Sequence, residues 1–303
     1  MQNTMTKRTL LSFLVLLIGL PGYAQLSKNS KWTGGLRDRY DVTENVVYSA
    51  IDPSSNRLDL YVPKEKTKPV PVLVWIHGGG WGRLSKDSVS SQIVPYLEYG
   101  WVVVNVDYRL TSVALAPAAV QDCRCVLRWI AANATRLNAD TKRIVISGTS
   151  AGGHLSLVTG MLPDGVSYDT LCGFIETPRV AAVVNHYGIT DVNDLLGGAN
   201  RKGYAVSWIG EQPNREEIAE AVSPLTYVRK TLPPIFSVQG DADPTVPYTH
   251  SVRLHKALDS LGVPNEFVTI PGGKHGRFTK EENEMIRERI DKFLKKYSIL
   301  TAN

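Results

Sequence analysis

The chain has 303 residues, of which 43% are hydrophobic and 21% are charged, a composition typical of a soluble globular protein. This length suits one large α/β domain with a sizeable core. The net charge is only +5, and no cluster of lysine and arginine accompanies it, which argues against a protein that binds nucleic acid.

The first 24 residues have the pattern of a secretory signal peptide. Lys7 and Arg8 precede an apolar run over 10–20, and small residues then permit cleavage after Ala24. The apolar run is too short for a stable membrane anchor, and because no cysteine lies near the cut, a lipid anchor is not expected. The sequence therefore predicts a secreted or periplasmic protein. Loss of Lys7 and Arg8 with the peptide lowers the net charge from +5 to +3.

Residues 25–40 are polar and are expected to form a flexible lead-in to a single domain over 41–303. Helical spacing of apolar residues predicts helices at 117–133, 250–261 and 280–297. Short apolar or alternating runs bounded by turn residues predict strands at 42–50, 57–62, 70–76, 101–106, 144–146, 180–184, 235–238 and 266–270.

Strands and helices alternate after residue 70, which predicts a mostly parallel central sheet with helices on both faces. Residues 189–230 contain no strand pattern and are expected to form a small helical cap, inserted over the carboxyl edge of this sheet. Since ligands of such sheets bind at the carboxyl ends of the strands, the residues that follow strands are the candidates for a site.

The strand at 144–146 runs into Gly148-Thr149-Ser150-Ala151-Gly152, a G-x-S-x-G pattern. This pattern is typical of a sharp strand-to-helix turn that exposes a nucleophilic serine in a strained backbone conformation. Glycines on both sides allow the strand and the helix to approach closely. The pattern predicts Ser150 as a nucleophile, and a serine needs a base at neutral pH.

His275 is the expected base, because it follows the last strand in a glycine-rich loop that can bring an imidazole over the serine. The other downstream histidines suit this role less well. His154 is expected to point away from the turn, His186 to pack at a strand end, and His250 and His255 to lie in solvent on a helix.

Asp241 and Asp243 both follow the preceding strand, where the third member of a triad is expected. Their spacing alone does not separate the two, since both lie on one loop. Whichever is not the catalytic acid is expected to cap that loop.

His77-Gly78-Gly79-Gly80-Trp81 follows the buried strand at 70–76. Glycines there leave backbone N–H groups free to point inward. The sequence predicts an oxyanion hole formed by the N–H groups of Gly79, Gly80 and Ala151.

Three cysteines remain after the predicted cleavage. Cys123 and Cys125 lie two apart on a predicted helix and face different directions, so one of them could pair with Cys172. Three buried free thiols are an equal alternative. No metal-ligand spacing is present, and no cofactor is expected.

Together these motifs resemble the α/β-hydrolase superfamily, and within it the bacterial feruloyl-esterase-like and hormone-sensitive-lipase-like carboxylesterases. The resemblance implies that Asp243, ahead of Val246-Pro247, is the acid. It departs at Gln239, where relatives often carry histidine, and this is expected to change only a strand-end residue. Asp107, Arg109 and Asp122 are expected to be structural. The matching segments are His77–Trp81, Asp107–Arg109, Gln121-Asp122, Gly148–His154, Gly240–Pro247 and Gly273–Gly276.

The resemblance implies a serine carboxylester hydrolase that acts through an acyl-enzyme on short-acyl or aromatic esters, such as the acetyl and feruloyl esters of plant polysaccharides. Trp81, Tyr187 and Trp208 are candidates for substrate binding, although each could instead pack in the core. An amidase or peptidase of the same fold is the alternative activity, and a non-catalytic binding protein is disfavoured because all three triad residues are present. The sequence does not predict the oligomeric state.

Overall fold

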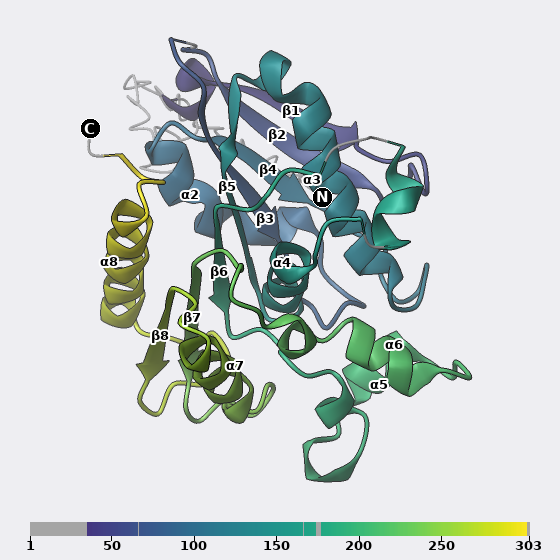
Figure 1. The fold of residues 1–303 in the computed structure, drawn as a ribbon. Helices are drawn as coiled ribbons and strands as arrows, with labels where there is room; N and C mark the ends of the chain where they lie inside the picture. The colour runs from purple at the N-terminus through teal and green to yellow at the C-terminus, as the bar shows by residue number, and fades with distance from the viewer. Residues whose placement is uncertain (1–34, 66, 166, 174–176, 302–303) are drawn as a thin grey trace, which may run out of the picture.

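The computed structural model describes residues 35–65, 67–165, 167–173 and 177–301, so the predicted signal peptide lies outside the described residues. The chain folds around one eight-stranded sheet of order β1-β2-β4-β3-β5-β6-β7-β8 (Figure 1). Residues 35–39, at the end of the expected lead-in, are helical. The strands are β1 Tyr40–Val47, β2 Arg57–Pro63, β3 Val70–Ile76, β4 Val102–Val106, β5 Ala139–Thr149, β6 Ala182–His186, β7 Ile235–Gly240 and β8 Asn265–Ile270.

The sheet is antiparallel at one edge and parallel through the rest. β1 pairs with β2 and β2 pairs with β4 in antiparallel register, whereas the strands from β4 through β3 and β5 to β8 run parallel to one another. Consequently the carboxyl ends of β3, β5, β6, β7 and β8 meet at one edge. The predicted mostly parallel sheet is therefore confirmed.

Helices cover both faces because successive side chains of each strand point in opposite directions. In β3, Val72 and Val74 belong to the core beneath α3, α4 and α7, whereas Leu73 and Trp75 belong to the core beneath α2 and α8. Each such buried side chain contributes roughly 1.5–3 kcal/mol relative to exposure. The helices are α2 Ser90–Glu98, α3 Ala118–Leu137, α4 Ala151–Met161, α7 Thr249–Ser260 and α8 Lys280–Lys296.

Between β6 and β7 the chain forms the predicted helical insertion, with α5 Gly203–Ile209 and α6 Arg215–Ala221 as its α-helices. Figure 1 shows both helices beyond the carboxyl ends of the strands. Trp208 and Ile209 of α5 and Ala219 of α6 are fully buried, so the insertion packs on the domain as part of its core.

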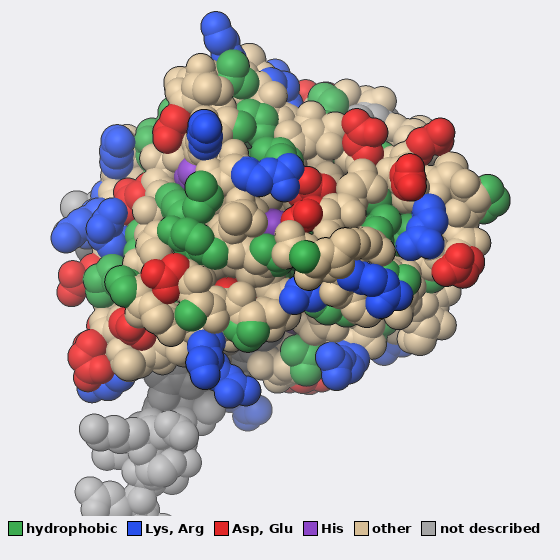
Figure 2. Space-filling model, turned by 90° about the horizontal axis from the view of Figure 1, so that it is seen from below, with side chains coloured by type: hydrophobic (Ala, Val, Ile, Leu, Met, Phe, Trp, Pro, Cys, Tyr) green, Lys and Arg blue, Asp and Glu red, His purple; other side chains and the backbone are tan. Residues whose placement is uncertain are grey.

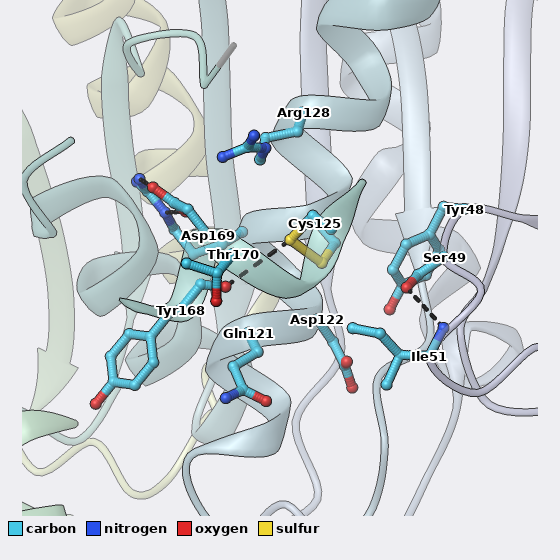
Figure 3. The surroundings of a disulfide bond; sticks show 12 residues. Tyr48, Ser49, Ile51, Gln121, Asp122, Cys125, Arg128, Tyr168, Asp169 and Thr170 are labelled. Atoms are coloured by element: carbon cyan, nitrogen blue, oxygen red, sulfur yellow. Dashed lines mark hydrogen bonds and ion pairs between the residues drawn. A yellow bond between two sulfur atoms is a disulfide. The ribbon is translucent and has the colours of Figure 1, made fainter. Parts of the chain in front are cut away.

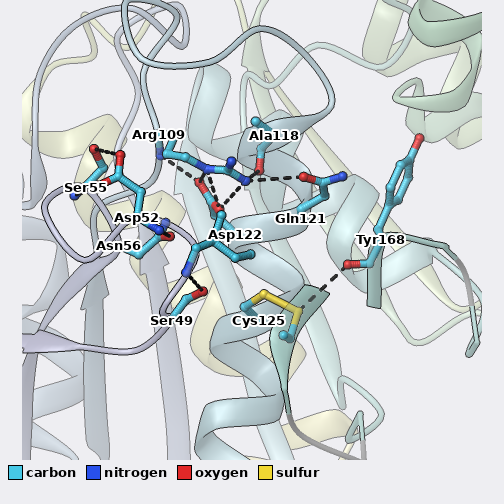
Figure 4. Close-up of polar contacts among 12 residues, drawn as sticks. Ser49, Asp52, Ser55, Asn56, Arg109, Ala118, Gln121, Asp122, Cys125 and Tyr168 are labelled. Atoms are coloured by element: carbon cyan, nitrogen blue, oxygen red, sulfur yellow. Dashed lines mark hydrogen bonds and ion pairs between the residues drawn. A yellow bond between two sulfur atoms is a disulfide. The ribbon is translucent and has the colours of Figure 1, made fainter. Parts of the chain in front are cut away.

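An ion pair joins the loop after β4 to the first turns of α3 (Figure 4). The Arg109 guanidinium and backbone N–H both donate to the fully buried Asp122 carboxylate, at 2.8–2.9 Å. Arg109 also donates to the Ala118 carbonyl. Removing one partner would leave a buried charge without compensation, at a cost of about 3–5 kcal/mol. The structural role expected for both residues is consistent with these contacts.

A disulfide links Cys125 on α3 to Cys172 at the end of a short 3-10 helix, Ser167–Cys172 (Figure 3). Cys123 is buried and unpaired. The alternative of three free thiols is therefore wrong. The two helical cysteines do face different ways, and only Cys125 points at the 3-10 helix.

Within the described ranges, no helix combines the length and the apolar character needed to cross a bilayer.

Candidate active site

Ser150 sits on the sharp turn between β5 and α4, with φ 55° and ψ −119°. A non-glycine residue with positive φ is strained, and here the surroundings hold it in place. The Ser150 N–H donates to the His186 carbonyl at the end of β6. Two residues after Ser150, a Cβ at Gly152 would lie 2.1 Å from the Ile76 carbonyl oxygen. Only glycine therefore permits this approach of α4 to β3.

His275 and Asp243 complete a continuous hydrogen-bonded chain with this serine. His275 Nε2 lies 2.8 Å from Ser150 Oγ, and His275 Nδ1 lies 2.8 Å from Asp243 Oδ2. The side chain of Asp243 has no exposed surface, whereas that of His275 is 21% exposed. The loops after β5, β7 and β8 therefore bring the three residues together as the sequence predicted.

The Asp243 carboxylate is held ionised by its hydrogen bonds. Burial alone would raise its pKa, but the bond from His275 and those from the N–H groups of Thr245 and Val246 lower the pKa below its usual value. Those N–H groups donate to Oδ1 at 2.8 and 3.1 Å. A buried anion with this orientation can fix the imidazole tautomer and stabilise an imidazolium.

Asp241 occupies a different position on the same loop. It is exposed, and its Oδ1 accepts the Gly272 N–H at 2.7 Å. It therefore ties the two loops together at the surface and makes no contact with His275. The geometry separates the two aspartates that their spacing alone could not.

The glycine-rich loop after β3 lies directly against Ser150. A Cβ at Gly78 would lie 3.3 Å from the Ser150 Cβ. Gly79 and Gly80 follow with φ of 102° and 60°, values that favour glycine. Their N–H groups have no hydrogen-bond acceptor among the described residues. Ala151 begins α4, where N–H groups lack intrahelical acceptors. Gly78 and Ala151 thus flank Ser150, and Gly79 and Gly80 follow Gly78 in the same loop, so the oxyanion hole stays a prediction.

Trp81 and Trp208 lie inside the protein, so the structure favours core packing over the expected substrate role for each. Both are fully buried, and their rings stack at a centroid distance of 4.1 Å. The positive φ of Trp81, 58°, turns its ring inward from the glycine loop. The pair joins this loop to α5 as core packing, which was the alternative considered for each residue.

His154 connects the same loop to the nucleophile helix and the cap. Its Nδ1 accepts from Trp81 Nε1 at 3.2 Å, so its Nε2–H donates to the Val222 carbonyl at 2.7 Å. Burial lowers its pKa to about 3. The imidazole is therefore neutral, points away from Ser150 as expected, and ties α4 to the end of α6.

His250 and His255 are buried, which corrects the expectation that they lie in solvent. His250 accepts the Thr190 N–H and contacts Asp194, so it holds the start of the insertion. His255 stacks on Phe267 of β8. Neither faces the triad. Within the part of the chain that the structure describes, no cluster of three His, Cys, Asp or Glu could hold a metal ion.

Tyr187 borders both the triad and a cavity of about 480 Å³ under α2 and α8. Its ring meets the His275 ring edge-on at 4.8 Å. Ser150 and His275 do not line this cavity, but their neighbours Thr149 and Gly276 do. Viewed from the end where the parallel strands finish, histidine is visible among acidic and hydrophobic side chains (Figure 2). A substrate role for Tyr187 remains a prediction.

Sequence reasoning missed Tyr204, the aromatic residue of α5 that lies nearest the triad. A Cβ at Gly80 would meet the Tyr204 Cβ at 3.1 Å, and the Tyr204 hydroxyl donates to the Thr245 carbonyl at 3.0 Å. The ring thus spans from the glycine loop to the loop that carries Asp243. Nothing in the sequence distinguishes it from other aromatic residues of the insertion.

His154→Gln should weaken the acid sensitivity of the fold. The folded-state pKa of about 3 lies below the ordinary 6.5, so unfolding takes up a proton between these values and stability is lost as pH falls. The variant should reduce the slope of unfolding free energy against pH by about 1.4 kcal/mol per pH unit between pH 4 and 6. Urea titrations across this range measure it. An unchanged slope would show that His154 is already protonated in the folded protein.

The chain is similar in sequence and in structure to known esterases. The sequence profile of the BD-FAE family matches residues 58–258. Esterase LipC of Mycobacterium tuberculosis is 27% identical over 80% of this chain and 62% of its own length. The chain spans less than two thirds of the length of the curated relatives it matches first.

Two solved structures are similar over nearly their whole length. A truncated carbohydrate esterase from gut microbiota has a TM-score of 0.73 and 29% identity, covering 86% of this chain and 98% of its own. The propionate-bound thermophilic esterase Est2 of Thermogutta terrifontis has a TM-score of 0.71 and 26% identity, covering 87% and 96%. The resemblance drawn from the motifs is confirmed, and the chain belongs to the BD-FAE family, with an α/β-hydrolase fold shared with esterases.

Proposed function

We propose that this protein is a serine carboxylester hydrolase. The observation that carries the proposal is the unbroken chain from Ser150 through His275 to Asp243, with 2.8 Å at each link. Its relatives and structural neighbours are named esterases, which favours an ester over an amide as the substrate.

In this mechanism His275 takes the hydroxyl proton as Ser150 attacks the ester carbonyl, and the imidazolium is stabilised by Asp243. The tetrahedral oxyanion accepts hydrogen bonds from the N–H groups of Gly79, Gly80 and Ala151. His275 then protonates the leaving alcohol, and an acyl-enzyme forms on Ser150. Water activated by the same imidazole releases the acid. Every step uses groups of the chain itself.

Substitutions in the proposed triad should show which of the two aspartates acts as its acid. Ser150→Ala should lower turnover of an aryl acetate by about 10⁶, because it removes the nucleophile. Asp243→Asn should lower turnover by about 10⁴, through the wrong imidazole tautomer. Asp241→Asn is the matched control on the same loop and should cost little. Far-UV circular dichroism checks the fold. Turnover near that of the parent in Ser150→Ala would exclude the serine mechanism, and a reversed aspartate ranking would exclude Asp243 as the acid.

We further propose that the substrates carry short acyl or aromatic groups, such as acetyl or feruloyl esters on a plant polysaccharide. The carbohydrate esterase and the propionate-bound esterase among the structural neighbours support this class. Tyr204 supports it independently, since its ring closes over the glycine loop and reaches the Asp243 loop. Each methylene of a longer acyl chain that fits the site gains at most about 0.8 kcal/mol from burial, whereas a methylene that clashes with this ring raises the activation barrier.

The ratio of kcat/KM for aryl octanoate to that for aryl acetate should be low and should depend on the Tyr204 ring. Tyr204→Ala should raise the ratio by about tenfold, the equivalent of 1.4 kcal/mol, whereas Tyr204→Phe keeps the ring and should leave it unchanged. The panel also includes butyrate, methyl ferulate and acetylated xylan. A parent maximum at octanoate would indicate a lipase-like site and contradict the proposed substrate class.

We also propose export from the cytoplasm with cleavage after Ala24. The charged start, the short apolar run and the small residues before Gln25 support it, as does the Cys125–Cys172 disulfide, since disulfides persist in oxidising compartments. The mature protein should begin near Gln25 when recovered from the periplasm or medium. N-terminal sequencing tests this, and soluble protein that retains Met1 would contradict it.

A further inference from the structure

Gln239 lies directly behind the Asp243–His275 pair, at the carboxyl end of β7. Its side chain is fully buried. Nε2 lies 2.9 Å from the Val246 carbonyl and 3.4 Å from Asp243 Oδ2, the same oxygen that bonds His275 Nδ1. The sequence expectation that Gln239 changes only a strand-end residue is therefore incomplete, because this side chain touches the acid of the triad.

The orientation of the Gln239 amide is determined by its neighbours. Asp243 Oδ2 and the Val246 carbonyl are both acceptors, so the group facing them must be the NH2, which has one hydrogen for each. On the other side, Gln239 Oε1 accepts from Ser251 Oγ on α7 at 2.6 Å. The reversed amide would put two acceptors beside an amide oxygen in a fully buried place. A chain of contacts therefore runs from Ser251 through Gln239 to Asp243.

The other ionisable groups around the pair do not compete with this contact. Tyr187 at the end of β6 and Tyr204 on α5 are neutral, since burial raises the pKa of both, that of Tyr187 to about 12. Asp241 is bonded to Gly272. Lys202 donates to the Pro244 carbonyl, and His250 on α7 contacts Asp194. Among the side chains that the structure describes, Gln239 is thus the one besides His275 that donates to the Asp243 carboxylate.

We propose that Gln239 is a positioning residue of the hydrolytic site, held by Ser251 so that its amide N–H fixes and stabilises the Asp243 carboxylate. The inference rests on the proposed role of Ser150, His275 and Asp243. The Gln239 N–H is a second donor to Asp243 Oδ2, so the negative charge of the carboxylate is shared between this N–H and the imidazole of His275. Gln239 therefore restrains the carboxylate in rotation and weakens its attraction for the proton on His275 Nδ1.

The test compares kcat/KM against pH for the parent and Gln239→Met, which keeps the length and removes the donor. The acid limb of this profile, where kcat/KM falls as the pH is lowered, reports the protonation of the general base in the free enzyme. It should move to higher pH by about 0.5–1 unit, a part of the effect of one hydrogen bond to a charged group, because the lost donor acts on His275 only through Asp243. Ser251→Ala leaves Gln239 present but free to turn, and should give a smaller shift in the same direction. Titration of the His275 ring by NMR in Ser150→Ala background gives the same shift without activity.

Gln212→Met is the matched control, because Gln212 donates to two backbone carbonyls, those of Ile209 and Ala116, away from the triad. It should leave the acid limb in place. Gln239→Met could instead lose stability while the acid limb of the pH profile and the His275 titration stay in place. Gln239 would then be a packing residue, and the inference would fail while the proposed function stood. Activity retained in Ser150→Ala would instead overturn the proposed function, and the inference with it. If Gln239→Met does not fold, Ser251→Ala decides the question by the same measurements.

Discussion

The strained turn at Ser150 is the constraint on which the arrangement of the site depends. A serine at φ 55° costs on the order of 1–3 kcal/mol, and the conformation persists only where neighbours enforce it. Here β3 and β6 flank β5 in parallel register, α4 packs within contact of the Ile76 carbonyl, and the Ser150 N–H is bonded to β6. The folding energy of the central sheet thus holds the hydroxyl within hydrogen-bond distance of His275.

The parallel topology of the sheet then brings the other residues of the site close to Ser150. The order β3-β5-β6-β7-β8 brings the glycine loop, the serine, the acid and the histidine to one edge, although they span about two hundred residues of sequence. Each loop is itself anchored. Trp81 and His154 tie the glycine loop to the nucleophile helix and the cap. Backbone N–H groups and Gln239 hold Asp243 from two sides. Such supports keep catalytic groups in register without large motion.

Local patterns were sufficient to predict the central strands, the turn at Ser150, and the positions of His275 and the glycine loop. These depend on glycine spacing and on apolar β-branched runs, which are visible in any single sequence. The triad acid needed the resemblance, because Asp241 and Asp243 differ only in which way their side chains point. In the structure Asp241 accepts the Gly272 N–H, whereas Asp243 contacts the His275 ring.

Features that depend on distant partners could not be predicted. The inward turn of Trp81 requires Trp208 of the insertion, more than a hundred residues later. His250 and His255 have helical spacing that suits a solvated face, yet Thr190, Asp194 and Phe267 bury them. The pairing of Cys125 rather than Cys123 depends on where the Ser167–Cys172 helix packs. In each case tertiary contacts decided between alternatives that were equal in the sequence.

The central claim is that Ser150 is a nucleophile activated by His275, and covalent labelling tests it most directly. A fluorophosphonate ester should phosphonylate one residue of the native protein, found by peptide mass spectrometry as Ser150. Labelling should vanish in Ser150→Ala, slow strongly in His275→Ala and stop when the native protein is unfolded. Labelling at another residue, or at Ser150 with the same rate in His275→Ala, would contradict the account.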